Sequence, residues 1–318
     1  MKKTSPIRVT ERDNPAANAL DTQKTREILR LMNIEDQKVA LAVRKALPQI
    51  TRAVDLAANA IANGGRLVYI GAGTSGRLGV LDASECRPTF GTDKVVAVLA
   101  GGPQAVFMAS EGNEDNRSNA RKDLQQIGLN RKDVLVGIAA SGRTPYTLEA
   151  LHYAKRKGAP TVGLTANPQS PMEELADVVI TVNVGPEILS GSTRLKAGTA
   201  QKLVLNMLST AAMVRVGRVF SGLMIQMEMT NEKLRERGMS ILMKAAGIDA
   251  ATAGRAMKAS GSNIPAALLM IWKKVPREEA IRILEEQPNT ALALRQARDE
   301  HLRQPSGQQR RRPPKRKS

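Results

Sequence analysis

Cysteine and histidine are almost absent from this sequence. The 318 residues include one cysteine, Cys86, and two histidines, His152 and His301. A single cysteine excludes a disulfide framework within the chain and suits the cytoplasm. So few of these ligands make a structural zinc site implausible, and we expect no metal.

Aromatic side chains and long apolar runs are also scarce. Aromatic residues form 2% of the chain, which is poor for stacking single-stranded bases. No apolar run approaches the ~18–20 residues of a membrane span, and no apolar core follows the basic start "MKK" as a secretory signal would require. We therefore expect a cytoplasmic protein without a membrane partner.

Positive charge, in contrast, is abundant. The formal net charge is +18, and the end of the chain from residue 302 holds seven Lys and Arg residues without one acidic residue. The remainder still carries +11. A basic body suits an anionic ligand such as a sugar phosphate or nucleic acid, or it only keeps the chain in solution. For the tail at 303–318 we expect disorder and favour a solubilising role over weak nucleic-acid binding.

Strand and helix signals alternate along the middle of the chain. Apolar residues recur at helical spacing over 16–63, and a long Ala-, Leu- and Met-rich helix follows "SGSTRL". Between them stand five runs that read as strands, at 66–71, 94–102, 133–142, 160–167 and 177–185. Continuous β-branched runs separated by helices predict a parallel sheet covered on both faces.

These patterns together predict an α/β fold, a three-layer αβα sandwich around a five-stranded parallel sheet. The predicted domains are an N-terminal helical segment packed on the sheet domain (1–63), the sheet domain itself (64–238), a small helical domain (239–302) and the basic tail (303–318).

A glycine-rich turn follows the first predicted strand. The stretch "GAGTSGRLG" at 71–79 contains the pattern G-x-G-x-x-G, which is typical of dinucleotide binding when an acidic residue ends the second strand. Here that strand ends in "GGPQ", and Asp93 precedes it. The fingerprint is incomplete at its most diagnostic position, and we expect no cofactor.

The tripeptide "SGR" ends this turn at 75–77 and recurs after the third strand at 141–143. Ligands of parallel sheets bind off the carboxyl ends of the strands. Hydroxyl groups there, with backbone N–H groups at helix starts, would form an anion cradle, although each loop alone could be a tight turn with a capping hydroxyl. The two equivalent loops favour the cradle, whose residues would be Thr74, Ser75, Ser141 and Thr144.

Longer motifs resemble one family. "GAGTSGRLG" with "AASGRTPYTLEAL" is similar to the sugar isomerase (SIS) domain. More narrowly, "IGAGTSGRLGVLDASECRPTFGT", "LAGGPQAVFMASEGNEDN" and "GPEILSGSTRLKAGTAQKLVLNMLSTAAM" resemble the N-acetylmuramic acid 6-phosphate etherases, over roughly residues 8–300. The related glucokinase regulatory protein has two such domains, and this chain has room for one.

The resemblance implies a reaction and the residues that perform it. The family cleaves the lactyl ether of the sugar phosphate by elimination and water addition, without metal or redox cofactor, to N-acetylglucosamine 6-phosphate and D-lactate. Glu85 in "SECRPTF" matches the acid that protonates the leaving oxygen, and Glu114 in "EGNEDN" matches the second catalytic carboxylate, our candidate base at C2. We expect both near the carboxyl edge of the sheet, Glu85 just after the first helix. Glu111 is the competitor of Glu114.

Further residues follow from the same resemblance. Glu187 is a candidate for sugar contact, and Lys196, near Ser192 and Arg194, either closes the site around the phosphate or caps a helix with solvent-facing charge. The resemblance also implies a homodimer, for which the Met-rich helix offers an apolar face. We interpret Cys86 as a packed small residue.

One departure from the family pattern lies beside the proposed acid. Arg87 stands where the family has proline. The loss of proline is expected to loosen the loop, and the positive charge of Arg87 to lower the pKa of Glu85. The alternatives to the etherase are a non-catalytic sugar-phosphate sensor, which could dispense with the carboxylates, and a sugar-phosphate isomerase.

Overall fold

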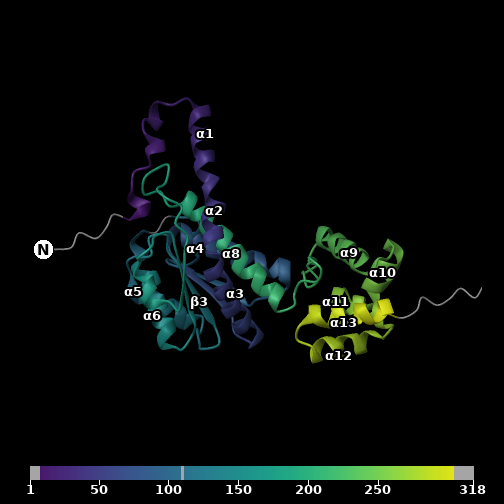
Figure 1. Cartoon of the computed structure of the whole chain (residues 1–318). Coiled ribbons are helices and arrows are strands. Elements are labelled where there is room, and N and C mark those ends of the chain that lie inside the picture. Colours follow the sequence, from purple (N-terminus) through teal and green to yellow (C-terminus); the bar gives the residue numbers. More distant parts are fainter. Residues whose placement is uncertain (1–7, 109–110, 304–318) are drawn as a thin grey trace, which may run out of the picture. The chain divides into compact units, whose positions relative to one another are not determined.

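The computed structural model of the protein describes residues 8–108 and 111–303 (Figure 1). The chain divides into two compact units, one up to Val216 and the other from Gly217. The sequence had placed a domain boundary at 238 instead. The predicted disordered tail at 303–318 lies, from residue 304 on, outside the described residues. No helix in the described ranges is long and apolar enough to cross a membrane.

The first unit is built on a five-stranded parallel sheet in the order β2-β1-β3-β4-β5. The strands are β1 (Leu67–Gly71), β2 (Val95–Leu99), β3 (Val134–Ile138), β4 (Thr161–Thr165) and β5 (Val178–Thr181). Each lies within a run that the sequence predicted to be a strand. The α/β fold class and the five-stranded parallel sheet are thus confirmed.

Helices cover both faces of this sheet. In Figure 1 α5 (Arg117–Gln126) and α6 (Pro145–Arg156) lie on one side of β3, with α3 (Leu47–Ala62), α4 (Gly73–Phe90) and α8 (Lys196–Arg215) on the other. The short helix α7 (Met172–Leu175) packs beside α6. Ahead of α3 come α1 (Thr25–Asp36) and α2 (Lys38–Lys45). Single 3-10 turns complete the unit: η1 (Val9–Glu11), η2 (Pro15–Ala17), η3 (Leu20–Thr22), η4 (Pro103–Val106) and η5 (Glu111–Asn113).

Alternation along β1 distributes side chains to the two faces. Val68 and Ile70 pack in one apolar cluster with Leu124 of α5 and Leu151 of α6. Tyr69 points to the other face, where its hydroxyl donates to the Asp82 carboxylate at 2.9 Å. Because both faces are covered, all five residues of β1 are buried, which explains its unbroken apolar sequence.

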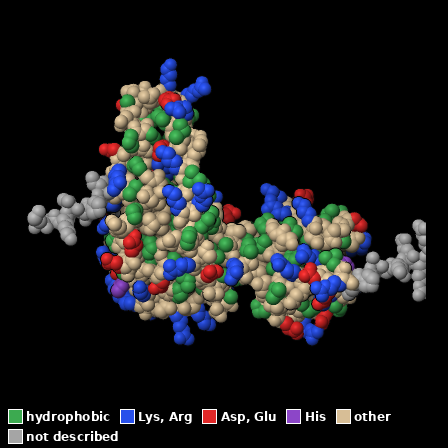
Figure 2. Space-filling model, in the orientation of Figure 1, with side chains coloured by type: hydrophobic (Ala, Val, Ile, Leu, Met, Phe, Trp, Pro, Cys, Tyr) green, Lys and Arg blue, Asp and Glu red, His purple; other side chains and the backbone are tan. Residues whose placement is uncertain are grey.

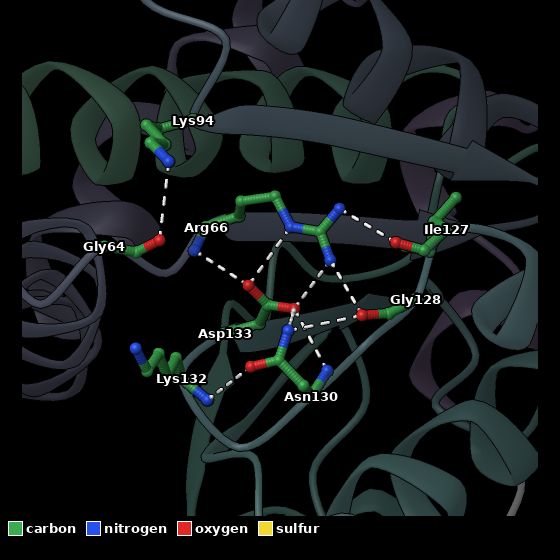
Figure 3. A network of polar contacts seen from close by, with 8 residues as sticks. All are labelled: Gly64, Arg66, Lys94, Ile127, Gly128, Asn130, Lys132 and Asp133. Atoms are coloured by element: carbon green, nitrogen blue, oxygen red, sulfur yellow. Dashed lines mark hydrogen bonds and ion pairs between the residues drawn. The ribbon is translucent and has the colours of Figure 1, made fainter.

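An ion pair with a buried carboxylate joins two strands at the amino edge of the sheet (Figure 3). The guanidinium of Arg66, just before β1, donates to the carboxylate of Asp133, just before β3, at 2.8 and 3.1 Å. Asp133 also accepts the backbone N–H groups of Arg66 and Asn130. The hydrogen bonds that Arg66 donates to the Asp133 carboxylate raise the pKa of Arg66. The pair joins two neighbouring strands at the end remote from their carboxyl termini.

The second unit contains helices only, apart from one isolated bridge between Phe220 and Leu223, in its described residues. They are α9 (Glu232–Ala246), α10 (Ala250–Ala259), α11 (Ile264–Lys273), α12 (Arg277–Glu286) and α13 (Thr290–Arg303). Leu268, Leu269 and Trp272 of α11 are buried in its core.

Basic side chains are spread over the surface. Figure 2 shows Lys and Arg side chains scattered over this face of each unit, interspersed with acidic ones, and not gathered in one patch. On this face, at least, the positive charge does not form a continuous stripe of the kind that follows a nucleic-acid backbone.

Candidate functional site

The order of the strands creates a crevice at one edge of the sheet. The chain leaves β1 toward β2 on one side, whereas β3 leads to β4 on the other. Loops that follow β1 and β3 therefore diverge above the carboxyl ends of two neighbouring strands. This switch point is where ligands bind in open parallel sheets. The helices α4 and α6 start there, so the positive ends of their dipoles face the crevice.

The glycines of the first turn serve close packing. A Cβ atom on Gly76 would lie 2.5 Å from the carbonyl oxygen of Gly71, and one on Gly71 would lie 2.8 Å from that of Ile138. Gly73 begins α4 with φ +53°, in the left-handed region that favours glycine. The G-x-G-x-x-G pattern thus brings α4 tightly against β1 and β3.

The four predicted cradle residues lie on the two loops at the crevice. Thr74 and Ser75 form the first turn of α4, and Ser141 and Thr144 precede α6. Thr74, Ser141 and Thr144 are half-buried, whereas Ser75 is buried and its hydroxyl donates to the Gln201 side chain at 3.0 Å. The Ser141 hydroxyl accepts the backbone N–H of Arg143 at 3.2 Å. Ser75 is therefore directed toward α8, and the other three residues are more accessible than Ser75.

Glu114 joins these loops, as expected. Its Oε1 atom lies 2.8 Å from where a Cβ on Gly73 would stand, at the start of α4. Its backbone carbonyl accepts the N–H of Tyr146, in the first turn of α6. Glu114 is thereby held between the starts of both helices, at the switch point. The side chain of its competitor, Glu111, lies outside the described part of the structure.

The expected position of Glu85, just after the first helix, is wrong. Glu85 lies inside α4, which continues to Phe90, and its side chain is exposed. Twelve residues separate it from Gly73, a distance of about 18 Å along a helix. Within one chain Glu85 is therefore remote from the crevice and from Glu114.

The last turn of α4 explains why the sequence suggested that this helix ends before Glu85. Pro88 cannot donate to the carbonyl of Ser84, yet the helix persists because Cys86 and Phe90 are buried in the core. It ends at Gly91, whose φ of +57° caps it. Arg87 and Glu85 stand two positions apart on this helix, so their side chains do not face each other.

Cys86 is a packed residue, as predicted. Its thiol is 2% exposed and lies 3.2 Å from the backbone carbonyl of Asp82. Burial, reinforced by the negative charge of Asp82, raises the pKa of the Cys86 thiol to about 12.

Glu187 and Lys196 have partners inside the chain. Glu187 is fully buried, and its carboxylate accepts the backbone N–H groups of Lys196 and Ala197 at 3.0 and 2.9 Å, which caps α8. Burial raises the pKa of Glu187. The ammonium group of Lys196, 2% exposed, contacts the Glu35 carboxylate at 2.5 Å. These bonds give both residues a positioning role in front of α8, and a contact with substrate stays a prediction.

One residue at the crevice escaped the sequence reasoning. Gln201 on α8 is 3% exposed, accepts from Ser75, and leaves its Nε2 group without a hydrogen-bond partner among the described residues. A buried donor of this kind is costly unless something else accepts from it. The contact joins residues 126 positions apart, so no local spacing could have indicated it.

The fold and the crevice define the class of protein. Its sheet carries the predicted cradle residues at the switch point, and a family model for the SIS domain matches residues 121–211. A model for the N-terminal SIS domain of glucokinase regulatory protein matches residues 49–155. The chain is thus a sugar isomerase (SIS) domain protein.

Proteins of similar sequence identify the family within this class. The chain is 54% identical to an N-acetylmuramic acid 6-phosphate etherase of Edwardsiella ictaluri, over 87% of this chain and 93% of that protein. It is 53% identical to an N-acetylmuramic acid 6-phosphate etherase from Aliivibrio fischeri, over 86% of this chain and 91% of that protein. A phosphoheptose isomerase structure from Francisella tularensis aligns with a TM-score of 0.48 at 18% identity, over 60% of this chain and 98% of that one. The chain belongs to the N-acetylmuramic acid 6-phosphate etherase family.

Proposed function

We propose that this protein cleaves the D-lactyl ether of N-acetylmuramic acid 6-phosphate, as a carbon–oxygen lyase of the cytoplasm. The observation that carries the proposal is the 54% identity to an etherase across 93% of that relative's length. The crevice supports it chemically, because two helix starts and several hydroxyls suit a phosphate, and a carboxylate, Glu114, lies beside them.

The reaction needs two proton transfers and one water molecule. In the open-chain aldehyde form of the sugar, a base takes the proton from C2, the C2–C3 double bond forms, and the C3–oxygen bond breaks. An acid gives a proton to the departing lactyl oxygen, and water then adds at C3. The products are N-acetylglucosamine 6-phosphate and D-lactate, so each turnover consumes one molecule of the ether and one of water.

Glu114 is the proposed base at C2. It lies between the starts of α4 and α6, next to the crevice that we propose for the phosphate, and positioned acid–base groups contribute about 10²–10⁴-fold in rate. Glu85 is the proposed acid that protonates the lactyl oxygen and then activates water. Since Glu85 lies about 18 Å along α4 from Gly73, it would serve the crevice of a second copy of the chain.

A homodimer is therefore part of the proposal. An apolar groove of about 830 Å³ runs between α3 and α8, and large apolar side chains are exposed in it: Leu47 at 43%, Met207 at 38% and Val214 at 47%. Leu29 and Leu41, on α1 and α2, are 61% and 53% exposed. Surfaces of this kind favour contact with another protein chain.

Complementation tests the roles and the dimer together. Glu85→Gln and Glu114→Gln, each expected to be inactive alone, are mixed under conditions that exchange subunits, and D-lactate release is measured. If each site takes Glu85 from one copy and Glu114 from the other, a mixed dimer keeps one intact site. An equal mixture then recovers about a quarter of wild-type activity. Sedimentation velocity establishes the oligomer.

Three results of this experiment contradict parts of the proposal. No recovery in a mixture shown to contain mixed dimers contradicts the shared site. Full activity of Glu85→Gln alone removes Glu85 from the chemistry. A monomer in solution contradicts the dimer.

The sensor alternative is less well supported. A family model of a regulatory protein does match part of the chain. The relatives with the name etherase cover far more of it, however, and the candidate carboxylates of a catalyst are present.

A further inference from the structure

A small basic pocket lies beside the crevice, above the end of β4. It has a volume of about 70 Å³ and is lined by three arginines, Arg8, Arg12 and Arg143, together with Asn167 and Ser170. Arg143 belongs to the same loop as Ser141, which faces the crevice. The pocket and the crevice therefore share one wall.

The N-terminal segment is fixed over this pocket by a buried anchor. Thr10, 1% exposed, donates its N–H to the Asn167 side chain at 3.4 Å, and Asn167 donates back to the Thr10 hydroxyl at 3.1 Å. Asn167 also donates to the carbonyl of Ala140 at 2.9 Å. Arg8 and Arg12 stand two residues before and after this anchor. Their position at the edge of the sheet thus follows from bonds that span more than 150 residues of sequence.

The floor of the pocket contains a buried hydroxyl without a partner. Ser170 is 4% exposed, and its hydroxyl has no hydrogen-bond partner among the described residues. A Cβ on Gly142, whose φ is +66°, would lie 2.6 Å from this hydroxyl oxygen, so only glycine fits there. Buried polar groups are usually hydrogen-bonded, and an exception indicates an absent partner.

The charges around the pocket are mostly positive. Arg8 has Glu11 at 4.0 Å, and the Glu173 carboxylate is occupied by the backbone N–H of Gln169 at 2.7 Å. Arg143 is exposed, and its guanidinium makes no ion pair within the described ranges. Arg143 therefore brings an uncompensated positive charge to the cavity, which favours an anion there.

We propose that this pocket binds the carboxylate of the lactyl group while the crevice holds the phosphate; this inference rests on the proposed function. The pocket is small, about 70 Å³, which suits a group of the size of a carboxylate. Arginine recognises planar carboxylates through two parallel hydrogen bonds.

The distance between the two anion sites fits one sugar. Neighbouring strands lie about 4.8 Å apart, so the pocket over β4 is roughly 5–10 Å from the crevice between β1 and β3. The phosphate on C6 and the lactyl group on C3 project from opposite sides of the sugar. One substrate can therefore reach both sites, and the pocket would distinguish the substrate by charge from sugar phosphates that lack the lactyl group.

Two sugar phosphates that differ only in the lactyl group test this assignment. KM for N-acetylmuramic acid 6-phosphate and the inhibition constant of N-acetylglucosamine 6-phosphate are measured in one D-lactate assay. The variants are Arg143→Gln and Ser170→Ala, with Arg131→Gln, an exposed arginine at the amino edge of the sheet, as control. We expect Arg143→Gln to raise KM about tenfold or more and Ser170→Ala to raise it severalfold. Inhibition by N-acetylglucosamine 6-phosphate should stay within about twofold of wild type.

An equal rise in KM and in the inhibition constant for Arg143→Gln would overturn the proposal and assign this arginine to the phosphate. Unchanged constants for both ligands in both variants would also overturn it. Failure of the proposed function is distinguishable, because the wild-type protein would then release no D-lactate before any variant is made.

Discussion

The buried ion pair of Glu35 and Lys196 makes a quantitative prediction about stability. Glu35 is 4% exposed and also contacts Lys38 and the Asn14 side chain. Burial alone would raise the pKa of Glu35, but the hydrogen bonds from Lys196, Lys38 and Asn14 outweigh it and lower this pKa from 4.5 to about 2. At about 1.4 kcal/mol per pKa unit, the ionised carboxylate stabilises the folded state by about 3 kcal/mol.

The substitution Glu35→Gln should therefore destabilise the first unit by about 3 kcal/mol at pH 7, because Lys196 stays buried without its counter-ion. Since the folded pKa is the lower one, this contribution is complete above pH 4.5. It declines as the pH falls from 4.5 toward 2. The difference in free energy of unfolding between wild type and variant should shrink across that window.

Urea unfolding followed by the tyrosine signal in near-UV circular dichroism provides the assay. All three tyrosines of the chain, Tyr69, Tyr146 and Tyr153, lie in the first unit, whereas the single tryptophan, Trp272, lies in the second. The matched control is Glu27→Gln, which removes an exposed ion pair with Arg30 from the same helix. A Glu35→Gln variant no less stable than this control, or a difference that is the same at pH 3 and pH 7, would refute the reasoning.

Three further predictions concern other contacts. Arg66→Ala should lower the free energy of unfolding by about 2 kcal/mol, because Asp133 is left buried; an equal loss for Arg30→Ala, an exposed pair, would contradict this. Gly73→Ala and Gly64→Ala should each cost about 1–2 kcal/mol of backbone strain. Only Gly73→Ala should reduce D-lactate release, because its Cβ displaces the Glu114 carboxylate, whereas nothing lies near Gly64; equal activities would refute the placement of Glu114. Cys86 should react with a thiol reagent at pH 8 only after unfolding, given a thiol pKa of about 12, and rapid labelling of the folded protein would contradict its burial.

The sheet could be predicted from the sequence because its strands are buried on both faces. Each appears as a short β-branched run bounded by turn residues, and the two "SGR" loops follow from their equal position after strands. The family resemblance identified Glu114 as a candidate, and its place after the second strand predicted that it lies near the carboxyl edge of the sheet. The parallel order of strands then brought it to the crevice.

Glu85 could not be placed in the same way. Pro88 suggests the end of a helix, and only the burial of Cys86 and Phe90 in the folded core keeps the last turn of α4 helical. The pairs Glu35–Lys196 and Thr10–Asn167 join residues 161 and 157 positions apart. Such contacts depend on tertiary packing, so the positioning role of Lys196 and the basic pocket at Ser170 have no local signal.

The central claim is most directly tested by D-lactate release from N-acetylmuramic acid 6-phosphate, measured for wild type, Glu114→Gln and the exposed control Glu174→Gln. We predict release by wild type and control, and a rate at least about 10²-fold lower for Glu114→Gln with binding of N-acetylglucosamine 6-phosphate retained. Wild-type protein that binds the sugar phosphate and releases no D-lactate would contradict it.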